Sequence, residues 1–78
     1  MSLDVIRRVF EDVLGLEGAV DWSSVEYQNT EGWDSVAHMA IVADLEDRFE
    51  IMFDIDDVID MSSFDETLRI LKKYQVGV

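Results

Sequence analysis

The sequence contains no cysteine and no proline among its 78 residues, and only four glycines. Without cysteine, the chain cannot form a disulfide framework, a thiolate metal site or a reactive thiol of its own. No apolar run approaches the roughly 20 residues that a membrane-spanning helix needs, and no basic-then-apolar leader opens the sequence. These absences predict a cytoplasmic protein.

Positive charge is also scarce, because six Lys and Arg residues face 18 Asp and Glu residues for a net charge of -12. The basic residues gather near the two ends, and between residues 9 and 68 the only one is Arg48. The negative electrostatic potential of such a surface repels phosphate backbones and anionic membranes. We therefore expect no nucleic acid and no membrane as a partner. The same potential attracts basic protein surfaces, although solubility alone also accounts for an acidic composition.

The length of the chain limits what the protein can contain. Residues 1–78 are expected to form a single domain, because so short a chain does not support two cores. A chain of this size buries only roughly 60% of the surface of its unfolded form. Its apolar content of 49% nevertheless argues against disorder. The small hydrophobic core of such a domain leaves little room for an enclosed active site.

Hydrophobic periodicity predicts a first helix from Ser2, as N-cap, to Gly15, as a left-handed stop. Residues 15–33 lack this periodicity, and we expect Trp22 and Trp33 to pin them back onto the helices as a long loop. The residues predicted to face inward from the first helix are Ile6, Val9, Phe10, Val13 and Leu14.

Three further helices follow the loop. A second helix is predicted from Asp34, as N-cap, to about Glu50, and a short third helix over residues 54–61. The fourth begins with a capping box, in which the Ser63 side chain bonds the Glu66 amide and the Glu66 side chain reaches back to Ser63. The predicted fold is all-α, a four-helix bundle with three main helices, a short third helix and a long loop between the first two.

The second helix has two apolar sides when its residues are placed about 100° apart. One side faces the core and consists of His38, Ile41, Val42, Leu45 and Phe49. The other side, here called the outer face, consists of an apolar strip, Val36, Met39, Ala40 and Ala43, with an acidic rim, Asp44, Glu46, Asp47 and Glu50. An apolar strip with a charged rim is typical of a protein docking surface. Single exposed apolar residues are also common on ordinary surfaces.

The second helix begins with Asp34-Ser35-Val36. A serine directly after an N-cap aspartate is exposed, and the helix amides and dipole there favour an attached phosphate. One helix length further on stands the run Leu45-Glu46-Asp47-Arg48-Phe49, followed by Ile51 and Phe53. With these motifs, the sequence resembles the acyl carrier protein family, including its peptidyl and aminoacyl carriers. The resemblance extends over essentially the whole chain.

The resemblance implies that Ser35 accepts 4′-phosphopantetheine from coenzyme A, through a phosphodiester made by a phosphopantetheinyl transferase. The arm then holds acyl groups as thioesters on the thiol that this chain lacks. Asp34 would help to place Ser35 against the transferase. The outer face would meet basic patches on an acyl- or aminoacyl-loading ligase and on downstream acyl-processing enzymes. The implied function is that of an acyl carrier protein in fatty acid, polyketide or related specialised biosynthesis. We expect the protein to be a monomer.

Some residues depart from the family pattern. Val36 stands where leucine is usual, and His38 is atypical of fatty-acid carriers. Ala37 and Ala40 replace acids that such carriers often have. These differences favour a specialised polyketide-like or aminoacyl carrier over a housekeeping fatty-acid carrier.

An enzyme, a calcium-binding protein and an unmodified adaptor are the alternatives to a carrier. An enzyme would need His38 as a base for Ser35, but His38 is predicted to face the core and no third catalytic residue is evident. A calcium loop starting at Asp54 has Ile59 where an EF-hand needs glycine and Asp65 where it needs glutamate. We therefore expect no catalytic residues and no metal site. An unmodified acidic adaptor that binds one partner through its second helix stays open, since it differs from a carrier only at Ser35.

Overall fold

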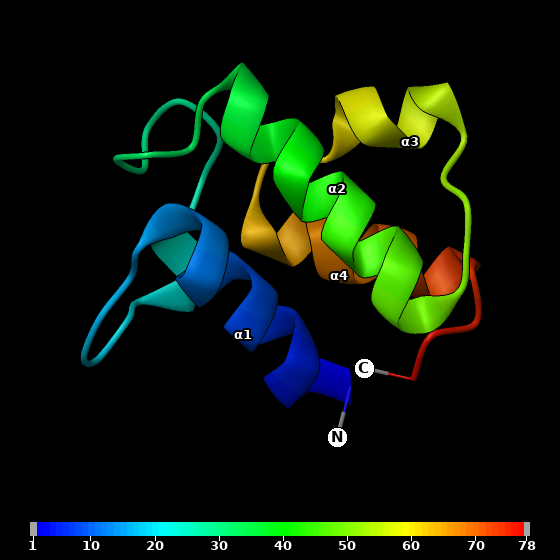
Figure 1. Ribbon diagram of the computed structural model, residues 1–78, viewed down its shortest axis with the longest axis horizontal. Helices are drawn as coiled ribbons and strands as arrows, with labels where there is room; N and C mark the ends of the chain where they lie inside the picture. Colours follow the sequence, from blue (N-terminus) through cyan, green and yellow to red (C-terminus); the bar gives the residue numbers. More distant parts are fainter. Residues whose placement is uncertain (1, 78) are drawn as a thin grey trace.

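Helices make up most of residues 2–77, the part of the chain that the computed structural model describes (Figure 1). The elements in chain order are α1 (Ser2–Leu14), the 3₁₀ turn η1 (Trp22–Ser24), α2 (Ser35–Phe49), α3 (Ile55–Asp60) and α4 (Phe64–Lys73). The predicted all-α bundle, with three main helices and a short third one, is confirmed. Of the helices within these residues, none combines the length and apolar content that crossing a bilayer requires.

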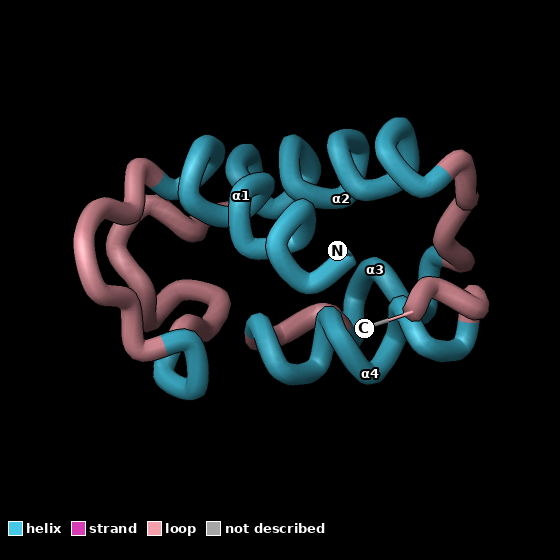
Figure 2. Tube along the Cα trace, turned by 90° about the horizontal axis from the view of Figure 1, so that it is seen from below, coloured by secondary structure: helices cyan, strands magenta, loops and turns pink. Residues whose placement is uncertain are grey.

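The helices form two layers. Figure 2 shows α1 and α2 in one layer and α4 in the other, and α3 lies beside α2 in Figure 1. The long connection between α1 and α2 gathers with η1 at one end of the molecule. The chain returns through α3 so that the last residues of α3 lie near the start of α2. This return brings two segments about 20 residues apart in sequence to the same end of the bundle.

Aromatic side chains join the loop to the helices. The Phe10 ring meets Trp33 edge-on at 5.2 Å and Phe64 edge-on at 5.0 Å, and the Trp22 ring lies 4.5 Å from that of Phe64. Trp33 is only 1% exposed, and Trp22 is half-buried. The prediction that both tryptophans pin the loop is confirmed. The buried apolar core consists of Ile6, Val9, Phe10, Leu14, Val25, Trp33, Ile41, Val42, Leu45, Phe53, Met61, Phe64, Ile70 and Leu71.

Two predicted helix caps need correction. Ser2 already lies within α1, so the N-cap falls outside the described residues. At α4, the Ser63 hydroxyl accepts the Glu66 N–H at 3.0 Å as predicted, but the reciprocal half of the capping box was wrong. The Glu66 carboxylate instead accepts from the Arg69 guanidinium at 2.7 Å, because a cation one turn away makes the stronger, charge-assisted bond.

Polar contacts fasten α3 to α4. The Lys73 ammonium donates to the buried Asp57 carboxylate at 2.7 Å, and the Tyr74 hydroxyl donates to its other oxygen at 2.6 Å. The Tyr74 oxygen in turn accepts the backbone N–H of Asp54 at 2.9 Å, directly before α3. The bonds from Lys73 and Tyr74 lower the pKa of Asp57.

The lowered pKa of Asp57 predicts a loss of stability in acid. A carboxyl whose pKa is lower in the folded state stabilises the fold above its unfolded pKa of about 3.9, and this stabilisation disappears as the pH falls through the folded pKa. We expect Asp57→Asn to lower the melting temperature clearly at pH 7 and by a smaller amount at pH 3, because the stabilisation begins to be lost below the unfolded pKa. Thermal unfolding at both pH values measures this. The exposed Asp65→Asn is the control, and an Asp57→Asn deficit that does not shrink in acid would contradict the prediction.

Candidate functional site

The first turn of α2 is fixed by Asp34. Its carboxylate accepts the Ala37 N–H at 2.9 Å, and its backbone carbonyl accepts the His38 N–H at 2.8 Å. Asp34 itself has the extended conformation of an N-cap, with φ -107° and ψ -172°. The predicted start of the second helix is therefore confirmed. Ser35, its first residue, is exposed, and its hydroxyl makes no hydrogen bond with any other described residue.

The chain segment before Ser35 determines which side chains face outward. Gly32 has φ +90°, and a Cβ there would come 3.2 Å from the Leu14 carbonyl oxygen, so only glycine fits without strain. The next residue, Trp33, turns into the core, and its backbone N–H donates to Thr30 O at 3.1 Å. With Trp33 buried, the residues that follow it, Asp34 and Ser35, are left on the surface.

The apolar strip of the outer face is exposed as predicted. Val36 is 79% exposed and Met39 is 55% exposed, and Ala40 and Ala43 are also exposed. The strip begins directly beside Ser35 and continues along α2. The surface beside Ser35 is therefore apolar and open to another protein.

The acidic rim is less uniform than its sequence indicates. Asp47 and Glu50 are exposed, but Asp44 accepts from the Arg48 guanidinium at 2.9 Å. Glu46 is half-buried, and its carboxylate accepts the backbone N–H of Phe53 at 3.0 Å. Glu46 therefore stabilises the connection between α2 and α3. An angular sorting of α2 alone could not place the chain that folds back onto it.

Three exposed apolar residues were not among the predicted site residues. Met52 is 83% exposed, Ile55 is 76% exposed and Ile59 is 72% exposed, on α3 and the segment before it. The sequence alone gives no signal for these residues, because Ile55, Val58 and Ile59 have the i, i+3, i+4 spacing of a single buried helix face. They add to the apolar surface that α2 exposes.

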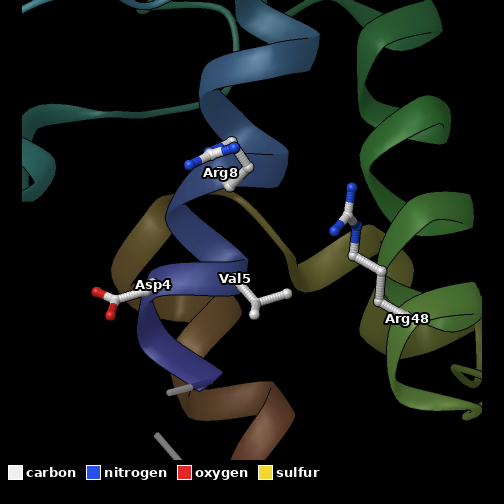
Figure 3. A pocket seen from close by; sticks show the side chains of 4 residues that line it. All are labelled: Asp4, Val5, Arg8 and Arg48. Atoms are coloured by element: carbon white, nitrogen blue, oxygen red, sulfur yellow. The ribbon is translucent and has the colours of Figure 1, made fainter.

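A groove of about 270 Å³ lies between α1 and α2 (Figure 3). It is lined by Asp4, Val5, Arg8 and Arg48. Arg48 stands in the last turn of α2, at the opposite end of the helix from Ser35. None of the predicted site residues lines this groove, so it is separate from the candidate site.

His38 is half-buried on the inner side of α2. Its Nδ1 accepts the indole N–H of Trp33 at 3.0 Å, and its Nε2 lies 2.8 Å from the carbonyl oxygen of Val58. Both ring nitrogens are thus engaged with groups other than Ser35. His38 is therefore not placed to act as a base for that hydroxyl.

A comparison with family models supplies independent information about this surface. The model described as "Phosphopantetheine attachment site" matches residues 4–71. The match extends from α1 into α4 and includes the start of α2, where Ser35 lies. Comparisons with curated proteins and with solved structures gave no match.

Proposed function

Because the chain belongs to the family of carrier domains with a phosphopantetheine attachment site, we propose that it is an acyl carrier protein that holds this group on Ser35. Domains of this family carry 4′-phosphopantetheine covalently and are not enzymes, so the predicted cofactor and the predicted absence of catalysis are both confirmed. The observation that supports Ser35 is that this residue is exposed on the first turn of α2.

The start of α2 fits a phosphodiester. The Asp34 carboxylate accepts the N–H of Ala37. The N–H groups of Ser35 and Val36 also belong to the first turn, where a helix has no acceptors of its own. Such amides and the helix dipole favour a negative group at this end. When bound, phosphopantetheine supplies a thiol on which an acyl group is held as a thioester, and the chain itself contains no cysteine.

The residues of the chain present the arm rather than perform chemistry. Asp34 fixes the first turn and keeps the Ser35 hydroxyl facing solvent, where a phosphopantetheinyl transferase reaches it. The apolar strip, Val36, Met39, Ala40 and Ala43, gives a partner enzyme a contact surface beside the arm. Asp47 and Glu50, with the paired Asp44 and the half-buried Glu46, face basic patches on the partner. Contacts of this kind form quickly and weaken with salt, as a shuttle between enzymes requires.

The carrier works with biosynthetic enzymes, as its family does. In this proposal they are an acyl-loading ligase and acyl-processing enzymes of fatty acid, polyketide or related specialised biosynthesis, in the cytoplasm. The protein acts as a single-domain monomer and binds neither nucleic acid nor membrane. Because Ala37 and Ala40 leave the first half of α2 less acidic than in fatty-acid carriers, an aminoacyl or peptidyl cargo is the alternative.

Intact-mass measurement tests the proposal. The purified protein is incubated with coenzyme A and a phosphopantetheinyl transferase of broad specificity. We expect the whole population to gain the mass of one phosphopantetheine group. A population that stays at its original mass, while a known carrier in the same tube is converted, would instead support an unmodified adaptor.

Asp34 is predicted to have two separable roles. Asp34→Ala removes the cap and should lower the free energy of unfolding by about 1 kcal/mol. Asp34→Asn keeps a capping oxygen but removes the charge, so we expect nearly unchanged stability and a slower modification of Ser35. Urea unfolding and initial rates of modification measure the two effects. Equal rates for Asp34→Asn and the wild type would contradict a role of the charge in transferase recognition.

A further inference from the structure

Helix α3 buries little apolar surface of its own. It has six residues, of which Ile55 and Ile59 are 76% and 72% exposed, Val58 is half-buried and the one buried side chain is that of Asp57. Isolated helices of this length do not form in water, because too few hydrogen bonds follow the costly first turn. The position of α3 therefore depends on the groups that fasten it to its neighbours.

Two polar anchors fasten α3. One is Asp57, which is bonded to Lys73 and Tyr74 and joins α3 to the end of α4. The other is the carbonyl of Val58, which accepts the Nε2–H of His38 at 2.8 Å and joins α3 to α2. His38 stands one helical turn after Ser35, so this second anchor connects α3 to the end of α2 that carries the attachment serine.

The imidazole of His38 is held in one orientation and one tautomer. An indole N–H can only donate and a backbone carbonyl can only accept. Nδ1 is therefore unprotonated, and Nε2 carries the hydrogen. The ring lies nearly parallel to that of Trp33, with centroids 6.0 Å apart and planes at 21°, and the Tyr27 ring lies at 5.2 Å on the loop side. Because Trp33 is only 1% exposed, His38 links α3 to a part of the chain that cannot easily move.

We propose that His38 is a positioning residue that fixes α3 against the Ser35 end of α2, so that an approaching enzyme meets both helices in one arrangement. The inference rests on the proposed function of Ser35. The apolar residues Val36 and Met39 on α2 and Ile59 on α3 are exposed, and the end of α3 lies near the start of α2 (Figure 1). An enzyme that contacts both helices binds less tightly when α3 is free to move away from α2.

Two amide variants separate the two bonds of His38. His38→Asn places an amide oxygen near the position of Nδ1 and keeps an acceptor for Trp33, but it has no donor that reaches Val58. His38→Gln places an amide N–H near the position of Nε2 and keeps the bond to Val58, but it loses the acceptor for Trp33. Each variant removes one hydrogen bond, so each serves as the stability control for the other.

The readout is the kinetics with which the transferase modifies Ser35, at a temperature where both variants are folded. We expect His38→Asn to raise KM about fivefold with little change in kcat, since a hydrogen bond of ordinary net strength corresponds to a factor of this size. His38→Gln should stay close to the wild-type KM. Equal KM values in the two variants, or a rise confined to His38→Gln, would overturn the positioning role.

Amide hydrogen exchange of the unmodified protein separates this inference from the proposed function. His38→Asn should speed exchange in residues 55–60 more than His38→Gln does, whether or not Ser35 is ever modified. Equal exchange there would overturn the inference even if the wild type is modified normally, whereas a wild type that is never modified refutes the proposed function instead. If neither variant folds, nitrogen NMR of the wild type decides, because an imidazole that carries its hydrogen on Nδ1 contradicts both bonds.

Discussion

Ser35→Ala is expected to gain no mass when it is incubated with coenzyme A and a phosphopantetheinyl transferase, under conditions that convert the wild type completely. The substitution removes the hydroxyl that forms the phosphodiester and leaves no other nucleophile at that place. Ser35 is exposed and its hydroxyl bonds no other described residue, so the fold should be unaffected. Surface substitutions of this kind change stability by less than about 0.5 kcal/mol. Intact mass and thermal unfolding of the same sample measure both effects.

Other exposed serines provide the matched controls. Ser24 lies in η1 and Ser62 lies before α4, and both are exposed. Neither follows an N-cap aspartate at the start of a long helix, so Ser24→Ala and Ser62→Ala should be converted as completely as the wild type. Partial conversion of Ser35→Ala would mean that a second hydroxyl accepts the group.

Trp33→Ala is expected to lower the free energy of unfolding by about 3–5 kcal/mol, as large-to-small substitutions of buried aromatic residues do. The variant loses the edge-on contact with Phe10 and the indole N–H that donates to His38. Free energies of unfolding of about 0.05–0.15 kcal/mol per residue are typical, so a chain of 78 residues has little stability to lose. We expect the variant to be largely unfolded at 37 °C. Urea unfolding followed by circular dichroism measures the loss.

Two substitutions serve as controls for Trp33→Ala. Trp33→Phe keeps a buried ring and removes the N–H. It should therefore lower the free energy of unfolding measurably, but by less than Trp33→Ala does. Val36→Ala lies three residues further on, but Val36 is 79% exposed, and the change should alter stability by less than about 0.5 kcal/mol. A Trp33→Ala variant as stable as Val36→Ala would show that the loop between α1 and α2 is not held by this side chain.

Much of the architecture could be predicted from local patterns. The apolar periodicity of residues 2–14 and 35–49 predicts helices where the structure has α1 and α2. A helix that buries one side repeats its apolar residues every three to four positions. Gly15 ends α1 with φ +69°, as a left-handed stop should. The exposure of Ser35 followed from its place after the capping residue Asp34.

Contacts between distant segments could not be predicted in the same way. The sequence places Glu46 in the acidic rim, because its angle on α2 follows from its position in the helix, but its bond to Phe53 depends on how the following loop folds back. The prediction that His38 faces the core is confirmed, yet its partner Val58 is 20 residues away. Periodicity identifies the side of a helix that is buried and contains no information about the group that it meets.

The most direct measurement of the central claim is the location of the attached group in the modified protein. Tandem mass spectrometry of the converted wild type should place phosphopantetheine on Ser35, within the fragment that begins α2, in every modified molecule. An adduct on another hydroxyl would contradict attachment at Ser35. So would a protein that remains unmodified while a control carrier is fully converted.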